Sequence, residues 1–214
     1  QGADGLLIFD LSDTDEDHDE AIDLIKKIHR KVSIPIIAGG NIKKLEDVKK
    51  FLYAGAKQAV LNFSKSSSVT LIEEVSKRFG KDRILASLYD FDALFKQQKL
   101  IEEYSAGIVF MHRVDMNSVS NVTELPYIVL TDTMEDQEIF KILKASGASG
   151  VSGKFVSQKE FAFDKFKQKC ADEGIKMTSF ESMMEFSEFK LNSDGLIPVI
   201  VQDYKTNSVL MLAY

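Results

Sequence analysis

The sequence predicts an α/β fold: a (β/α)8 TIM-like barrel whose first βα unit is missing or outside this chain, followed by the start of a small β-rich domain. Three observations predict it. Short apolar runs recur along the chain, a stretch of helical periodicity follows most of them, and small residues precede several of them. This alternation is typical of parallel sheets, because their strands are buried on both faces and joined by helices.

Seven apolar runs are predicted to be strands, because each is nearly continuous in Ile, Val and Leu. They cover residues 5–11, 34–38, 58–62, 84–88, 107–111, 127–131 and 150–155. Apolar residues at helical spacing mark the first three intervening helices. The markers are Ala21, Ile22, Leu24, Ile25 and Ile28, then Leu45, Val48, Phe51 and Leu52, then Val69, Leu71, Ile72, Val75 and Phe79. Residues 116–125 have little helical periodicity, so this crossover is expected to be short.

A doubly wound sheet and a closed barrel both fit the alternation, and small-residue caps favour the barrel. The caps that stand just before strands are Gly2-Ala3, Gly55-Ala56, Ser105-Ala106-Gly107 and Gly147-Ala148. The first and third lie roughly half a barrel apart, as do the second and fourth, if the second half is shorter. A half-barrel repeated twice explains this spacing better than a doubly wound sheet.

The pattern changes after Gly174. Residues 177–189 are rich in Met and Phe and are predicted to form an amphipathic helix. Two apolar runs, 196–201 and 209–214, then flank a polar segment, which is typical of a β-hairpin.

We therefore predict two domains, residues 1–190 and 191–214, with the boundary near residues 190–194. Both ends of the chain are abrupt, so we expect a fragment of a longer protein.

Composition limits the partners. The formal charge of −6 and pI near 5.2 argue against nucleic acid, which binds basic surfaces. No apolar run approaches the roughly 20 residues that span a bilayer, so no membrane is expected. Cys170 is the single cysteine, which fits a cytoplasmic protein without an internal disulfide.

One family resemblance rests on the first eighty or so residues. The stretch 34–42, Ile-Pro-Ile-Ile-Ala-Gly-Gly-Asn-Ile, resembles a barrel family of histidine biosynthesis, and so do 2–11, 45–48 and 54–56. That family contains the cyclase subunit of imidazole glycerol phosphate synthase and the related phosphoribosyl isomerase. The resemblance implies that residues 2–11 are the second strand of its barrel.

A second resemblance lies in residues 192–203 and 209–214, which look like the opening hairpin of phosphoribosyl-AMP cyclohydrolase. Together the two resemble a bifunctional phosphoribosyl-AMP cyclohydrolase and phosphoribosyl-ATP diphosphatase that carries an extra barrel. Residues 1–190 would then be a degenerate barrel of the histidine-biosynthesis type.

Carboxylates at the ends of strands one and five act as acid and base in the barrel family. Strand one is absent here, and the strand-five position falls on Tyr89, or on Asp90 if the register slips by one residue. Tyrosine is a poor base at neutral pH. Asp10, which ends strand two, is the other candidate, although an N-cap or a solvated loop acid explains it as well. The barrel is therefore expected to have lost catalysis.

Glycine-rich loops hold two substrate phosphates in that family, since glycine lets a phosphate approach backbone amides. Gly39 and Gly40 retain one such loop, and Asn62 and Ser64 follow the next strand. A tight turn without a ligand explains the two glycines equally well. The symmetric loop, 130–136, holds three carboxylates instead, so the second phosphate site is expected to be lost.

No metal ligands or cofactors are predicted within these residues. The acidic run 13–20 lacks the glycine and glutamate of a calcium loop and suits a helix start instead. His112 and Asp115 fit a site pair or a satisfied loop pair. The cyclohydrolase resemblance implies zinc and magnesium in domains further downstream.

The expected function is histidine biosynthesis by a parent enzyme that hydrolyses phosphoribosyl-AMP, and phosphoribosyl-ATP as well. The barrel would be an accessory or regulatory domain in a possible homodimer. Two alternatives stay open: the barrel senses a phosphorylated ribosyl metabolite, or it is still an active isomerase or cyclase.

Overall fold

The computed structural model describes residues 2–158, 161–177, 189–203 and 208–213. The chain divides into two compact units, Gln1–Met177 and Thr178–Tyr214, and each is described by itself. The predicted boundary near residues 190–194 stays a prediction. Most of the helix predicted over residues 177–189 lies outside the described residues.

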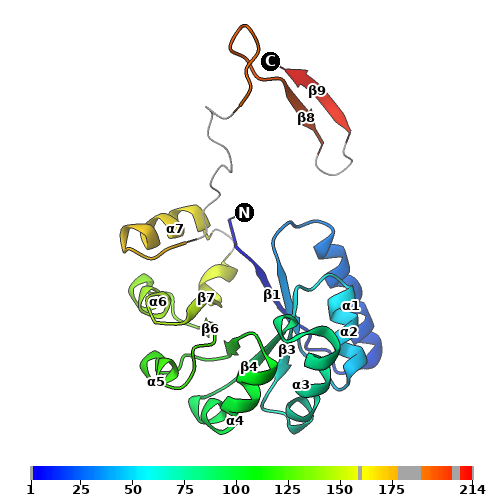
Figure 1. The fold of residues 1–214 in the computed structure, drawn as a ribbon, viewed down its shortest axis with the longest axis vertical. Helices are drawn as coiled ribbons and strands as arrows, with labels where there is room; N and C mark the ends of the chain where they lie inside the picture. The colour runs from blue at the N-terminus through cyan, green and yellow to red at the C-terminus, as the bar shows by residue number, and fades with distance from the viewer. Residues whose placement is uncertain (1, 159–160, 178–188, 204–207, 214) are drawn as a thin grey trace. The chain divides into compact units, whose positions relative to one another are not determined.

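The first unit is a nearly closed barrel of seven parallel strands, with helices on the outside (Figure 1). The strands follow chain order, and each pairs with the next in parallel. They are β1 (Leu6–Phe9), β2 (Ile36–Gly39), β3 (Gln58–Asn62), β4 (Ile84–Leu88), β5 (Ile108–Phe110), β6 (Tyr127–Thr131) and β7 (Ala148–Gly153). The predicted α/β barrel is confirmed.

Helices connect successive strands. They are α1 (Asp15–His29), α2 (Leu45–Tyr53), α3 (Ser66–Phe79), α4 (Phe91–Tyr104), α5 (Met116–Ser120), α6 (Asp136–Leu143) and α7 (Phe163–Asp172), with 3-10 turns η1 (Lys81–Arg83) and η2 (Lys154–Ser157). The acidic run begins α1, where Thr14 accepts a hydrogen bond from the Asp17 amide and acids favour the helix dipole. The crossover predicted to be short contains only the five-residue α5.

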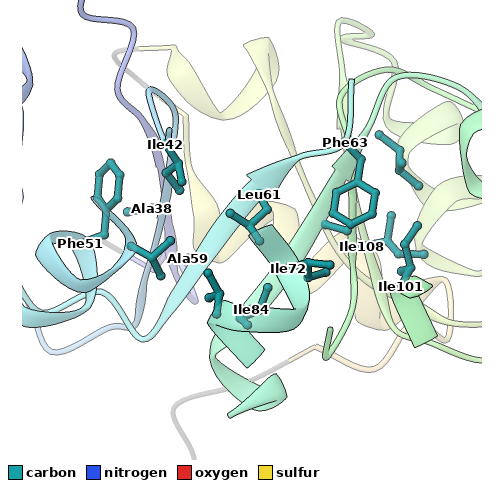
Figure 2. Close-up of a cluster of buried hydrophobic side chains, with 14 of the residues drawn as sticks. Ala38, Ile42, Phe51, Ala59, Leu61, Phe63, Ile72, Ile84, Ile101 and Ile108 are labelled. Carbon is teal, nitrogen blue, oxygen red and sulfur yellow. The ribbon is translucent and has the colours of Figure 1, made fainter. Parts of the chain in front are cut away.

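The larger hydrophobic core lies between the sheet and the helices. Figure 2 shows residues of the strands, such as Ala59 and Leu61, beside residues of the helices, such as Phe51 and Ile72. Each of these four side chains is essentially inaccessible to solvent. The helical periodicity in the sequence is therefore the stripe that covers the barrel wall.

A smaller core fills the barrel interior. It is built on Val60, Leu85 and Val109, with Leu7 and Phe9 packed against it. Residues on the opposite face of the same strand, such as Leu6 and Ile8, pack instead against the larger core between the sheet and the helices, here called the outer core. This alternation follows from the pleat of a strand, and it determines which side chains at the strand ends face the barrel mouth.

The second unit contains an antiparallel pair, β8 (Val199–Gln202) and β9 (Val209–Ala213), with a register shift between Val201 and Gln202. The antiparallel pairing predicted there is confirmed, and residues 204–207 lie outside the described residues. Within the described residues, no helix is long and apolar enough to cross a bilayer.

Candidate functional site

A cavity of about 740 Å³ opens at the carboxyl ends of β1, β5, β6 and β7. Its apolar floor is formed by Leu7, Phe9, Met111 and Leu130. Its polar rim consists of His112, Arg113, Thr131, Asp132, Thr133, Ser152, Gly153, Lys154 and Ser157. In a barrel of parallel strands this end carries the functional residues, because the connecting loops converge there.

The charged side chains at the rim are paired. Lys154 Nζ lies 3.3 Å from Asp132 Oδ1, and both side chains are largely exposed. Arg113 donates to Glu138, which also pairs with Lys141. An anionic ligand could therefore bind Lys154 or Arg113 only by displacing the carboxylates that pair with them.

The acidic loop after β6 is less repulsive than its sequence indicates. Of its three carboxylates, Asp132 pairs with Lys154 and Asp136 pairs with Lys169 at 2.6 Å. The loop itself is ordered by Thr131, whose hydroxyl accepts from the Thr133 amide. Because two of its carboxylates are paired with lysines, this loop would repel a phosphate less than the sequence alone predicts.

Asp10 does not face the cavity. It is 6% exposed, and its Oδ2 lies 2.5 Å from Nδ1 of His18 in α1, while its Oδ1 accepts from the Ser12 amide. The carboxylate is therefore directed at the helix layer, on the parity of Leu6 and Ile8. The interpretation as a solvated loop acid is wrong, and a catalytic role stays a prediction.

The pKa of Asp10 lies below its ordinary value of 3.8. Burial acts to raise the pKa, but the hydrogen bonds from His18 and Ser12 outweigh it. A lowered pKa in the folded state means that ionised Asp10 stabilises the fold above the unfolded-state pKa. That contribution is lost as the pH falls through the folded-state value.

We predict that Asp10→Asn destabilises the protein at pH 7, and that the difference from the unmodified chain shrinks as the pH falls below about 4. Urea unfolding at a series of pH values between neutrality and the acid limit of folding measures it. A difference independent of pH would show that the Asp10 charge contributes nothing.

Tyr89 and Asp90 take different roles because they point to opposite sides of the strand. Leu88 is buried in the outer core, so Tyr89 has the inward parity of Leu85. The Tyr89 ring lies 5.4 Å from the His112 ring at the cavity rim. Asp90 instead caps α4, accepting from the Ala93 amide at 2.8 Å. Tyr89 thus has the inward position and Asp90 the outward one. Which of the two matches the family's carboxylate stays a prediction, as does catalysis by Asp90.

His112 and Asp115 have different contacts. Asp115 caps α5 by accepting from the amide and hydroxyl of Ser118, and these bonds lower its pKa. His112 contacts Tyr89. Asp115 is thus accounted for by its helix cap.

Close packing of the backbone accounts for Gly39 and Gly40. Gly40 has φ +93°, and a Cβ there would lie 2.0 Å from the Asp10 carbonyl oxygen. A Cβ on Gly39 would lie 2.8 Å from Val60. The tight-turn interpretation explains both glycines, and phosphate binding there stays a prediction.

The predicted phosphate ligands on the next strand are also partly engaged. The Asn62 side-chain oxygen accepts from the Ser64 amide at 2.9 Å. This bond occupies the side-chain acceptor of Asn62 and uses the Ser64 backbone donor that a phosphate would need. Their ligand role stays a prediction.

The sequence interpretation missed the residues at the end of β7. It continued the strand to Phe155, whereas β7 ends at Gly153 and the turn η2 begins at Lys154. Gly153 has φ +141°, and a Cβ there would lie 1.9 Å from the Thr131 carbonyl oxygen. The Gly-Lys pair inside an apolar run was the signal that the strand ends there.

Two other chemistries receive no support. Burial raises the pKa of the Cys170 thiol to about 11, so it is not a reactive thiolate at neutral pH. No group of three or more His, Cys, Asp or Glu side chains suited to a metal ion occurs among the described residues.

The family described as "Histidine biosynthesis protein" matches residues 1–146, which include β1 to β6. This chain belongs to that family. The family match covers the outer core of Figure 2 and most of the barrel mouth, but not β7 or the second unit.

Curated relatives of this family member are named "Imidazole glycerol phosphate synthase subunit HisF". The protein of Exiguobacterium sibiricum is 39% identical over 80 residues, which are 37% of this chain and 32% of the relative. That of Microcystis aeruginosa is 37% identical over 87 residues, 41% of this chain and 34% of the relative. In both, the match spans about a third of the relative's length.

A longer alignment extends the similarity over most of the barrel. The HisF subunit of Methanocaldococcus jannaschii is 23% identical over 229 aligned positions, covering 83% of this chain and 84% of the relative. The identity is thus higher in the short alignments than in the long one.

Proposed function

We propose that this barrel is a non-catalytic accessory domain in a protein of histidine biosynthesis. One observation carries the proposal: the candidate carboxylates are engaged in the fold. Asp10 is bound to His18 and Ser12, Asp90 caps α4, and Tyr89 holds the inward position. A general base must reach the substrate's proton, and neither carboxylate is directed at the cavity.

We further propose that residues 191–214 open a phosphoribosyl-AMP cyclohydrolase domain, in a parent that hydrolyses phosphoribosyl-ATP as well. The resemblance of residues 192–203 and 209–214 supports this, and β8 and β9 form the antiparallel pair it implies. Zinc would supply an activated water for that hydrolysis. The zinc and magnesium ligands would lie outside the 214 residues.

The test is a phosphoribosyl-AMP cyclohydrolase assay on the parent protein, with and without residues 1–190. We expect both to hydrolyse the substrate, with the deletion changing stability or regulation more than turnover. Circular dichroism shows whether the shortened protein folds. Activity in neither protein would overturn the cyclohydrolase assignment, and isomerase or cyclase activity that Asp90→Asn abolishes would overturn the non-catalytic role.

The cavity favours a second candidate function, binding of a phosphorylated ribosyl metabolite. Lys154 and Arg113 stand on its rim, with the hydroxyls of Thr133, Ser152 and Ser157. These are suitable donors for phosphate and ribose oxygens. The barrel would then sense a metabolite without converting it.

We predict that a phosphoribosyl metabolite raises the melting temperature, and that Lys154→Ala removes the shift. A ligand at about 100 times its Kd adds about 2.7 kcal/mol of stability. Lys169→Ala is the matched control, because Lys169 also pairs with an aspartate of this loop segment but does not line the cavity. Equal shifts in both variants, or none in the unmodified chain, would contradict metabolite sensing.

Assembly is part of the same proposal. The relatives' printed name describes a subunit of a synthase. For this chain, association with another protein or with a second copy is a proposal, which sedimentation of the parent protein tests.

A further inference from the structure

A groove of about 740 Å³ lies between α5 and α6, two neighbouring helices on the outside of the barrel (Figure 1). We call it the α5–α6 groove. It is lined by residues 113–117, which lead into α5, and by residues at the C-terminal end of α6. Arg113 lines the cavity at the barrel mouth as well. The two cavities thus share this side chain, and otherwise different residues line them.

The charged residues that line the α5–α6 groove are mainly cations. They include Arg113, Lys141 and Lys144, whereas the one carboxylate among the described lining residues is that of Asp115. This carboxylate is directed at the start of α5, where it accepts from the amide and the hydroxyl of Ser118. An anion in the groove would therefore be attracted by more charged groups than repel it.

The three cations keep hydrogen-bond donors for a ligand, although each has a carboxylate partner. Arg113 and Lys141 share Glu138, and Lys144 pairs with Glu173 at 2.8 Å. Neither glutamate lines the groove. A guanidinium has five N–H donors and an ammonium group three, so one partner leaves donors over. The cationic side chains are 47–69% exposed, and ion pairs as exposed as these are weak.

The dipole of α6 accounts for only part of this arrangement. Lys141 lies in the last turn of α6 and Lys144 is its C-cap residue, where cations stabilise a helix. Arg113 lies between β5 and α5, so the same reason does not apply to it. Its convergence with two lysines of another element indicates a site that attracts anions.

The remaining wall of the groove is largely apolar. Val114 and Met116 line it on the α5 side, and Ile142 and Ala145 line it on the α6 side. Ile142 is 1% exposed and belongs to the outer core, so its position is fixed by packing. Methionine is flexible and adapts to the shape of what it contacts. This wall suits a small apolar group attached to the anion.

We propose that the α5–α6 groove binds a phosphate monoester that carries a compact apolar group. The phosphate contacts Arg113, Lys141 and Lys144, and the apolar group lies against Met116 and Ile142. A phosphate monoester suits these cations better than a carboxylate, because it has close to two negative charges and three strong acceptor oxygens at neutral pH. This site is independent of metabolite sensing at the barrel mouth.

The test is a titration of the isotope-labelled chain with phenyl phosphate, followed by the NMR signals of the backbone amides. We expect signals of residues 113–117 and 141–145 to shift, and inorganic phosphate to bind more weakly because it lacks the ring. The double variant Lys141→Ala, Lys144→Ala should bind phenyl phosphate at least about tenfold more weakly, because two charge-assisted hydrogen bonds are lost. Lys77→Ala is the matched control and should leave the affinity unchanged. Lys77 also pairs with a glutamate of its own helix and is 69% exposed, as Lys141 is.

The variant Lys154→Ala separates the groove from the mouth, because Lys154 lines the mouth cavity but not the groove. Its groove signals should respond to phenyl phosphate as in the unmodified chain, even if the mouth binds no metabolite. Absence of shifts in the groove, or shifts at the mouth alone, would overturn the proposal. So would equal affinity of the double variant and the unmodified chain. Equal binding of inorganic phosphate and phenyl phosphate would overturn the role of the apolar wall.

Discussion

Replacing His18 with Leu is expected to lower the free energy of unfolding by roughly 3–5 kcal/mol, because it leaves a buried carboxylate without its partner. His18 is 4% exposed and Asp10 is 6% exposed. After the substitution the hydrogen bonds to Asp10 would come from Ser12. Urea unfolding at pH 7 measures the loss.

The double variant Asp10→Asn, His18→Leu separates the unpaired charge from lost packing. It should recover part of the stability, because Asn is neutral and can still accept from the Ser12 amide. Packing against Phe51, whose ring lies 5.7 Å from that of His18, is altered in both variants. Asp19→Asn is the surface control: Asp19 pairs with Lys50 in solvent, so a small change is expected. Equal losses in the single and double variants would assign the effect to packing.

Gly40→Ala is expected to destabilise the barrel by at least about 2 kcal/mol more than Gly80→Ala, because only the added methyl group at position 40 would push a neighbouring backbone segment away. The two glycines have similar φ values, +93° and +87°. A Cβ on Gly40 would overlap the backbone of Asp10, whereas nothing lies within 4 Å of one on Gly80. Gly80→Ala therefore reports the conformational strain at a positive φ without a collision, roughly 1–3 kcal/mol.

Thermal unfolding of the two variants provides the comparison. Gly40→Ala should also weaken the hydrogen bond from Asn41 to Ser12, since the loop must move away from Asp10. Equal destabilisation by the two substitutions would mean that the loop shifts freely. Gly40 would then be retained for another reason, such as access of an anion to the backbone.

The structure changes how the candidate site is understood. The residues taken from the family resemblance lie on two sides of the barrel wall: Tyr89 faces the mouth, whereas Asp10 is directed at α1. The polar rim of the cavity is formed mainly after β5, β6 and β7, by residues such as Arg113 and Lys154. The strongest resemblance lies instead in the first eighty or so residues.

The sequence by itself determined the order of strands and helices, the parallel barrel and the short crossover at α5. These follow from local patterns: apolar runs make buried strands, and apolar residues at helical spacing make the stripe that covers them. The hairpin of β8 and β9 was predictable for the same reason, since two apolar runs flank a polar turn.

Only the tertiary structure decided which side chains meet. His18 lies in an acidic run that read as a helix start, and its partnership with Asp10 arises because α1 folds back over β1. A shift of one residue in the register of β4 would exchange the inward and outward positions of Tyr89 and Asp90, and no local sequence pattern determines that register. The close approach of Gly40 to Asp10 likewise depends on neighbouring strands 4.7–4.9 Å or so apart, a typical spacing set by pairing rather than by either segment alone.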